Sequence, residues 1–383
     1  MTTAVISADS HFVEPPEMWA QRIDPEFRSR APRLVRDPAG GDGEVLVCEN
    51  LMPSGGAAYF AAGVRPDDLP EVMARGWEAA PEHVRDPAAR LAAQDEDRVR
   101  AEVLYASYGM QLFHLDDASL RRACFRAFNS WAAEYCAQAP DRLIGTALID
   151  LEDVPEAVAE LERAAKAGLR GAMIWAEPPL DRPYSHPDYA AFFAASQDLD
   201  MKLSLHALTS KRPASDPGEG DILYRSVVLY QEIGRTLSDL ILHGVLERFP
   251  RLQIISAENE IGWMPFHTWR MDQLYEKLYA ISDVKLPMKP SEYLRRQCHA
   301  TFIEDRLLAQ TGIDAAAANI MWSSDFPHLA SSWPRSHEFI DASLGDIDGP
   351  DRRAIVHDNV ARLYRLTTAG TDGVDATSEV ARA

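Results

Sequence analysis

Four ionisable side chains in this sequence could together hold one divalent metal ion. Asp9 and His11 form a D-x-H pair, His206 ends the run KLSLH, and Asp325 lies in SSDFPH. Neutral imidazoles and carboxylates are ligands that suit Zn²⁺ or Mn²⁺. A lone histidine or a D-x-H pair is common by chance, so a metal site is indicated only if the fold brings all four residues together.

The elements that must position these residues follow from an alternation of strands and helices. Short runs rich in β-branched and other apolar residues alternate with helical stretches, which is typical of a parallel sheet. There are eight such runs, at 4–9, 101–107, 143–149, 170–175, 202–206, 252–257, 299–303 and 319–324. Eight units that close on themselves form a (β/α)8 barrel, so the sequence predicts an α/β fold of the TIM-barrel type.

The candidate ligands lie at the ends of three predicted strands. In a TIM barrel, polar side chains at the C-terminal ends of the strands meet at one mouth. Asp9 and His11 are two positions apart in an extended segment, so their side chains point to the same face. His206 ends the fifth strand and Asp325 follows the eighth. We therefore predict one divalent ion, first Zn²⁺ and second Mn²⁺, bound by all four residues.

Further polar residues near the predicted mouth have candidate roles in catalysis. Asp325 could also act as a base, and Glu258 directly follows the sixth strand, where it could orient a water molecule or transfer a proton. A carboxylate at a strand end can equally cap a helix or pair with an arginine. We predict that His328 and Arg296 contact the substrate, the arginine through a carboxylate, although a histidine beside a proline can also be purely structural.

The chain is predicted to form one domain with two additions. Residues 1–365 make the barrel, and 20–95 form an insertion between the first and second barrel strands that caps the mouth. Turn signals in GDGEVLVCENLMPSGG, at 41–56, indicate a hairpin within this insertion. Residues 366–383 lack apolar periodicity and are predicted to be a flexible tail.

Composition narrows the possible partners. The net charge of −20, from 39 basic and 59 acidic side chains, would repel nucleic acid. No apolar run is long enough to span a bilayer or resembles a signal peptide, so we expect a cytoplasmic protein. The four cysteines are widely spaced and predict reduced thiols. We expect a small-molecule substrate and a homodimer or larger homo-oligomer, with Trp263, Phe266 and Trp269 packing a helix or a subunit contact.

Several segments together resemble a known family. They are ADSHFVEPPEMW (8–19), LSLHA (203–207), HGVLERFPRLQIISAENEIGWMPF (243–266), MWSSDFPH (321–328) and NVARLY (359–364). The chain resembles, over about 4–365, the amidohydrolase-related family that includes aminocarboxymuconate semialdehyde decarboxylase and the resorcylate decarboxylases. The resemblance implies that Asp9, His11, His206 and Asp325 are the metal ligands.

Two departures from the family pattern concern the chemistry. The decarboxylases of the family carry a histidine at the end of strand six that is thought to transfer a proton, and Glu258 stands nearest that position here. The binuclear branch of the wider superfamily usually bridges its metals with a carboxylated lysine on strand four, and RGAMIW contains no lysine. Glu177, just beyond that strand, could bridge instead, but one metal ion is the prediction.

These observations leave several functions open. A metal with an open position can activate water, which predicts a hydrolase acting on a small, ring-containing carbonyl or carboxylate compound, with Asp325 as base. The same metal could chelate the carboxylate and adjacent phenolate of an aromatic acid and support decarboxylation, or support dehydrative ring closure. The missing strand-six histidine favours hydrolysis as the main prediction. A non-catalytic barrel scaffold is disfavoured because all four ligand positions are intact.

Overall fold

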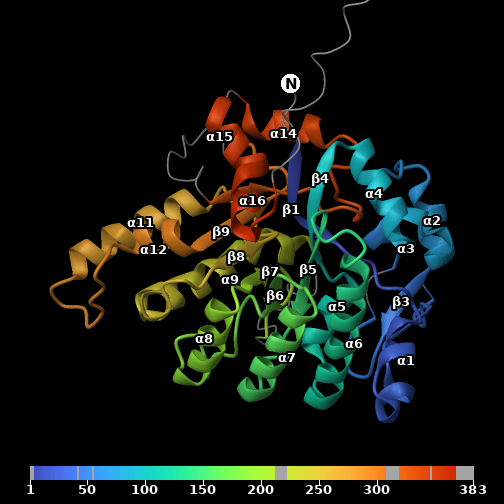
Figure 1. The fold of residues 1–383 in the computed structure, drawn as a ribbon, viewed down its shortest axis with the longest axis horizontal. Coiled ribbons are helices and arrows are strands. Elements are labelled where there is room, and N and C mark those ends of the chain that lie inside the picture. Colours follow the sequence, from blue (N-terminus) through green and yellow to red (C-terminus); the bar gives the residue numbers. More distant parts are fainter. Residues whose placement is uncertain are drawn as a thin grey trace, which may run out of the picture.

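The computed structural model describes residues 4–40, 43–53, 56–211, 222–307, 319–345 and 347–367. Its main feature is an eight-stranded parallel sheet in the order β1-β4-β5-β6-β7-β8-β9-β10, curled into a barrel (Figure 1). The strands are β1 (Val5–His11), β4 (Val99–Tyr105), β5 (Leu143–Leu148), β6 (Gly171–Ile174), β7 (Lys202–His206), β8 (Ile254–Ala257), β9 (Cys298–Phe302) and β10 (Ile320–Trp322). Every predicted run overlaps one of them, so the predicted TIM barrel is confirmed.

The barrel strands are buried on both faces. All residues of β1, β5, β6, β7, β8, β9 and β10 are buried. Strands covered on both sides read as continuous apolar runs, without the alternation of a half-exposed strand. This explains why the runs could be recognised in the sequence.

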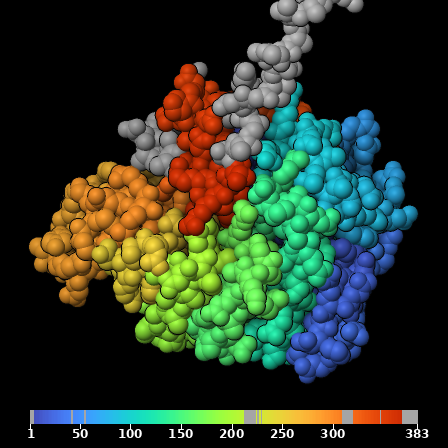
Figure 2. Space-filling view, in the orientation of Figure 1, coloured from blue at the N-terminus to red at the C-terminus, as the bar shows by residue number. Residues whose placement is uncertain are grey.

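Helices surround the barrel, and in Figure 2 the side chains of α6, α7 and α8 close over the strands on the face in view. The longer helices are α4 (Pro87–Glu96), α6 (Ala118–Cys136), α7 (Val154–Lys166), α8 (Ala190–Asp198), α9 (Ile222–Leu242), α11 (Met264–Leu278), α12 (Pro290–Gln297) and α14 (Ser336–Leu344). The shorter ones are α1 (Met18–Arg22), α2 (Leu69–Arg75), α3 (Glu82–Arg85), α5 (Tyr108–Gln111), α10 (Val245–Arg248), α15 (Gly349–Arg353) and α16 (Asn359–Tyr364). None of the helices in the described part of the chain has the length and apolar character to cross a membrane.

Helix α7 illustrates how local sequence sets these elements. The side chain of Asp153 accepts a hydrogen bond from the Glu156 amide and caps the first turn. Leu161 is fully buried in the face that packs on the barrel. Gly168, with φ +100°, ends the helix and turns the chain into β6.

The two end strands of the sheet, β1 and β10, meet at a seam that closes the barrel. The Asp325 amide donates to the Asp9 carbonyl over 3.0 Å, and the His11 amide donates to the Phe326 carbonyl over 2.7 Å. Below these bonds, three buried serine hydroxyls lie within hydrogen-bonding distance of one another, at 2.9, 3.0 and 3.1 Å; they belong to Ser7, Ser10 and Ser324. The seam therefore joins the strand ends that carry three of the predicted ligands.

The insertion between β1 and β4 contains α1 to α4 and an antiparallel pair, β2 (Arg33–Arg36) and β3 (Glu44–Val47). The hairpin predicted within 41–56 is thus only partly right, because its first strand lies earlier, at 33–36. The Leu329 amide donates to the Ala58 carbonyl and the Ala62 amide to the Pro327 carbonyl. Part of the insertion therefore packs on the loop that follows β10, while its role as a cap stays a prediction.

The ends of other predicted segments can also be placed. In the predicted tail, Leu366 is partly buried against the core and its amide bonds to the Ala361 carbonyl, whereas 368–383 lies outside the described residues. The four cysteines are buried and free, as predicted.

Candidate metal centre

Asp9, His11, His206 and Asp325 lie close to one another at the C-terminal ends of the strands; we call these four residues the metal cluster. Among the described residues, Asp9, His11 and His206 form one possible metal-binding group, with ligand atoms within 4.8 Å of one another, and Asp325 joins His11 in a second group. His11 Nε2 lies 3.5 Å from Asp9 Oδ1 and 3.2 Å from Asp325 Oδ1. His206 Nε2 lies 3.7 Å from Asp9 Oδ1. All four residues are at most 2% exposed. The fold thus brings together residues that are up to 316 positions apart in the sequence.

One donor atom of each residue in the metal cluster is buried without a hydrogen-bond partner. These atoms are Asp9 Oδ1, His11 Nε2, His206 Nε2 and Asp325 Oδ1. Buried polar atoms are nearly always satisfied, and four unsatisfied atoms facing one another indicate a missing common partner. A divalent cation is that partner in chemical terms, because two carboxylate oxygens and two imidazole nitrogens are a suitable ligand set for Zn²⁺ or Mn²⁺.

The two imidazoles are oriented as metal ligands. His11 Nδ1 lies 3.0 Å from the Ala106 carbonyl, and His206 Nδ1 lies 2.9 Å from the Ala207 carbonyl. A carbonyl oxygen only accepts, so each Nδ1 carries a hydrogen and each Nε2 is the ring nitrogen that faces the centre of the cluster.

Thr301, at the end of β9, supports the cluster from outside. Its hydroxyl donates to Asp9 Oδ2 over 3.2 Å and accepts the Glu258 amide over 2.9 Å. This leaves Asp9 Oδ1 directed at the two histidines. Our sequence analysis considered ionisable groups only and missed Thr301, although its position at a strand end is the same signal that identified the ligands.

Electrostatics within the cluster favour binding of a cation. Burial lowers the pKa of His11 to about 4, which keeps this imidazole neutral. Burial opposes charge on His206 as well, but the carboxylates of Asp9 and Glu258 outweigh it and raise its pKa to about 9. Burial also opposes ionisation of Asp325, yet His328 and His11 hold its pKa below the usual range. The cluster is therefore rich in negative charge.

Glu258 reaches the metal cluster from the end of β8. Its Oε2 lies 3.5 Å from His206 Nε2. The Glu258 side chain is 29% exposed, whereas the side chains of the metal cluster are at most 3% exposed. Burial, together with the Asp325 carboxylate, raises the pKa of Glu258 well above its usual range. Glu258 has φ 56° and Asp325 φ 54°, a left-handed conformation that is costly for such residues and is concentrated at functional sites.

His328 also belongs to this region, as predicted, and its imidazole stacks on that of His11 with 3.9 Å between ring centroids. Its Nδ1 lies 3.0 Å from Asp325 Oδ1 and its Nε2 lies 2.8 Å from Ser107 Oγ. The Ser107 hydroxyl donates to the Phe12 carbonyl, so it accepts the hydrogen of His328 Nε2. In the described part of the chain, a second possible metal-binding group is formed by His11, Asp325 and His328 and shares His11 with the first.

Two other candidates lie away from the cluster. Arg296 is on α12, before β9, and its guanidinium donates to the Leu246 carbonyl and to Gln297. Residues that precede a strand lie at the opposite end of the barrel from its mouth, so we correct the prediction that Arg296 binds substrate. Glu177 is paired with Arg235 over 3.0 Å and takes no part in either possible metal-binding group.

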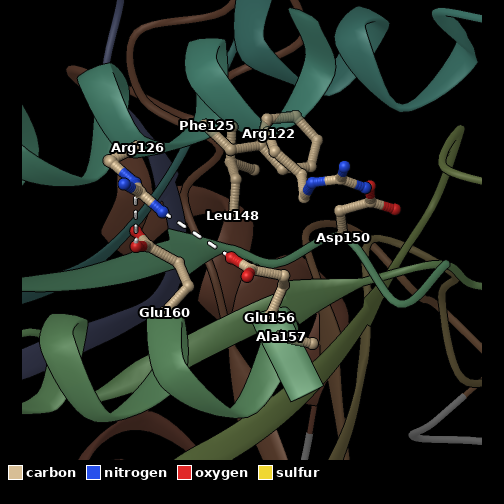
Figure 3. A pocket seen from close by; sticks show the side chains of 8 residues that line it. All are labelled: Arg122, Phe125, Arg126, Leu148, Asp150, Glu156, Ala157 and Glu160. Atoms are coloured by element: carbon tan, nitrogen blue, oxygen red, sulfur yellow. Dashed lines mark ion pairs between the residues drawn. The ribbon is translucent and has the colours of Figure 1, made fainter. Parts of the chain in front are cut away.

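A shallow pocket lies elsewhere, between α6 and α7 on the outside of the barrel (Figure 3). It is lined by Arg122, Phe125, Arg126, Leu148, Asp150, Glu156, Ala157 and Glu160. Figure 3 shows Arg126 directed at two of the acids, with 3.7 Å to Glu160 and 3.9 Å to Glu156. The charged side chains of this pocket are thus paired with one another, and the pocket contains no residue of the metal cluster.

Comparison with known proteins identifies the family of the chain. The family model described as Amidohydrolase matches residues 12–366. Gamma-resorcylate decarboxylase from a Rhizobium species is 28% identical over 264 residues, which cover 64% of this chain and 76% of that protein.

Solved structures share the fold. The crystal structure of an amidohydrolase from Mycobacterium avium subsp. paratuberculosis superposes with a TM-score of 0.74 at 22% identity and covers 95% of this chain and 100% of that one. A dihydroxybenzoic acid decarboxylase from Polaromonas, solved with manganese and the inhibitor 2-nitroresorcinol, has a TM-score of 0.64 at 21% identity and covers 95% of this chain and 98% of that one.

Proposed function

The chain belongs to the amidohydrolase family, and from this premise we propose that it is a metal-dependent decarboxylase of a small aromatic acid with a hydroxyl group next to its carboxylate. The observation that carries the proposal is the set of four buried, unsatisfied donor atoms in the metal cluster. The similarity to gamma-resorcylate decarboxylase supports the choice of reaction. Gamma-resorcylate is a benzoate with a hydroxyl group on each side of the carboxylate, and this defines the proposed substrate class.

This proposal revises the order of our hypotheses. Hydrolysis was the main prediction because the strand-six histidine is missing. Glu258, however, reaches the metal cluster from the same strand end, 3.5 Å from His206 Nε2, so an acidic group is available there for proton transfer. The absence of the histidine is therefore no longer an argument against decarboxylation.

In the proposed reaction, the ring carbon that bears the carboxylate takes up a proton, the bond to the carboxylate breaks, and CO₂ leaves while the electron pair returns to the ring. A divalent ion in the cluster would chelate the carboxylate and the adjacent phenolate oxygen and stabilise their negative charge. That ion would be held by the metal cluster, Asp9, His11, His206 and Asp325, and the position of the substrate would thereby be fixed.

Glu258 is the proposed proton donor. It is the acid beside the cluster that is reached by solvent, and its raised pKa favours the protonated form that a donor must have. After the transfer its carboxylate can regain a proton from water at the mouth. His328, held by Ser107 beside Asp325, is proposed to contact the substrate on the side of β10.

The test compares acids that differ only in the neighbouring hydroxyl group. We expect metal-loaded protein to release CO₂ from gamma-resorcylate and none from benzoate, which cannot form the chelate. The His206→Ala variant serves as the control for contaminating enzymes. Hydrolysis of a lactone or amide panel, with no turnover of any ortho-hydroxylated acid, would refute the proposal in favour of our original hydrolase prediction.

The identity of the ion is part of the same proposal. Zn²⁺ remains our first expectation and Mn²⁺, which the Polaromonas structure carries, the second. Elemental analysis of protein purified without added metal, followed by reconstitution with each ion, distinguishes them through the ion that restores CO₂ release.

A further inference from the structure

We propose that Arg90 is a positioning residue for the metal centre. Its guanidinium holds together the two strand ends that carry His11 and Asp325. The inference rests on the metal site of the proposed function. Arg90 belongs to α4, in the insertion, and its side chain is only 1% exposed. It contacts the backbone behind the metal cluster rather than the cluster's donor atoms.

Three nitrogens of Arg90 bind acceptors on three separate segments. Nη1 donates to the His11 carbonyl over 2.6 Å, Nη2 to the Phe326 carbonyl over 3.1 Å, and Nε to Glu102 Oε2 over 2.7 Å. These acceptors lie on β1, just after β10, and on β4. One rigid, planar group thus fixes the relative positions of all three segments.

The bonds of Arg90 add a side-chain link to the backbone and serine hydrogen bonds that hold the seam of the barrel. The Phe326 carbonyl that it binds also accepts the His11 amide over 2.7 Å, so the guanidinium completes a ring of contacts between β1 and the chain after β10. His11 supplies one unsatisfied donor atom, and Asp325, next to Phe326, supplies another. A shift of either backbone would move a donor atom away from the common centre.

Stability alone is a poor explanation for this arrangement. A buried ion pair such as Arg90 with Glu102 often contributes no more than apolar side chains of similar volume would. Gln94 also donates to Glu102 Oε2, over 2.6 Å, which holds that carboxylate in place for Arg90. The geometry points to orientation as the benefit, because Lys could keep the charge but could not reach three acceptors in fixed directions.

The test uses Arg90→Lys with Arg121→Lys as a matched control. Arg121 is likewise fully buried, pairs with Asp150 over 3.0 Å and donates to the Leu115 carbonyl, but it touches neither β1 nor the chain after β10. Each protein is freed of metal and titrated with Mn²⁺, and the dissociation constant and the line shape of the bound ion are measured by electron paramagnetic resonance. Melting temperature is recorded in parallel.

We expect Arg90→Lys to weaken Mn²⁺ binding about 10-fold to 100-fold, the range typical for partners that orient metal ligands, and to broaden the spectrum. Arg121→Lys should lower the melting temperature while the Mn²⁺ dissociation constant stays within about twofold of the wild-type value. If both variants lose stability and both bind Mn²⁺ as the wild type does, Arg90 is only structural and the inference is refuted.

Two further outcomes are also decisive. If Arg90→Lys does not fold, Glu102→Gln keeps the shape of the acceptor but removes its charge; a Mn²⁺ affinity at least about threefold weaker supports the inference, and an unchanged affinity overturns it. If the wild type binds neither Mn²⁺ nor Zn²⁺, which is measured by competition against a chelating dye, the metal site fails and the inference falls with it. Because no substrate is used, an unsuccessful decarboxylation assay leaves this test intact.

Discussion

Replacing Glu258 with Gln should separate proton transfer from metal binding. Gln keeps the volume and hydrogen-bonding shape of the side chain but cannot donate the proton that decarboxylation requires. Removal of a positioned acid usually lowers kcat by about 10² to 10⁴, or about 3 to 5 kcal/mol of transition-state stabilisation. Since the Glu258 side chain is 29% exposed, water can partly replace it, and we expect the lower half of that range.

The same substitution should leave metal content unchanged and stabilise the metal-free protein. The pKa of Glu258 is raised by burial and by the Asp325 carboxylate, so its charged form is disfavoured in the fold and Gln relieves that conflict. Turnover of gamma-resorcylate, elemental analysis and thermal melting of the metal-free protein are the three measurements. Wild-type kcat in the variant would refute Glu258 as the donor. Loss of the metal would instead make Glu258 a ligand.

Three other predictions address the metal, the acid stability and the assembly. His206→Ala should abolish metal retention and activity but keep the circular dichroism of the barrel, whose core is apolar; loss of helical signal would mean that the ion is structural. Burial lowers the pKa of His299 in the folded protein to about 3, whereas its pKa in the unfolded chain is 6.5. The fold is therefore most stable above pH 6.5, and it loses stability as the pH falls from 6.5 towards 3, because only the unfolded chain takes up the proton. His299→Gln should therefore reduce the loss of stability between pH 6.5 and 4.5 by about 2 kcal/mol, measured by urea unfolding, and an identical loss in both proteins would contradict this. Phe266 and Trp269 on α11 are 68% and 55% exposed, which supports the predicted homo-oligomer; light scattering should give a mass above that of one chain, and Phe266→Ser with Trp269→Ser should lower it.

The fold, and the proximity of the candidate ligands to one another, could be predicted because both depend on local patterns. The barrel strands are buried and rich in apolar residues, so each appears as a short run in the sequence. Asp9, His11, His206 and Asp325 stand at the ends of such runs, where the geometry of the barrel directs polar side chains to one place. The same rule argues against Arg296, which precedes its strand, and applying it consistently would have avoided that error.

The parts that could not be predicted depend on contacts between distant segments. Arg90 binds the carbonyl of a residue 236 positions later, and nothing in the sequence around it indicates this partner. The hydroxyls of Ser7, Ser10 and Ser324 are likewise brought together only by closure of the barrel. The first strand of the hairpin, RLVR at 33–36, is too short and too charged for its composition to identify it.

The seam between β1 and β10 sets the order in which the protein can become functional during synthesis. The ribosome makes Asp9 and His11 first, but their partner Asp325 emerges more than 300 residues later. Contacts so distant in sequence form late, since a long loop must be closed before they can contribute. An incomplete chain that ends before β10 has no closed seam and only part of the candidate ligand set, so on the proposed function full-affinity metal uptake would follow completion of the barrel.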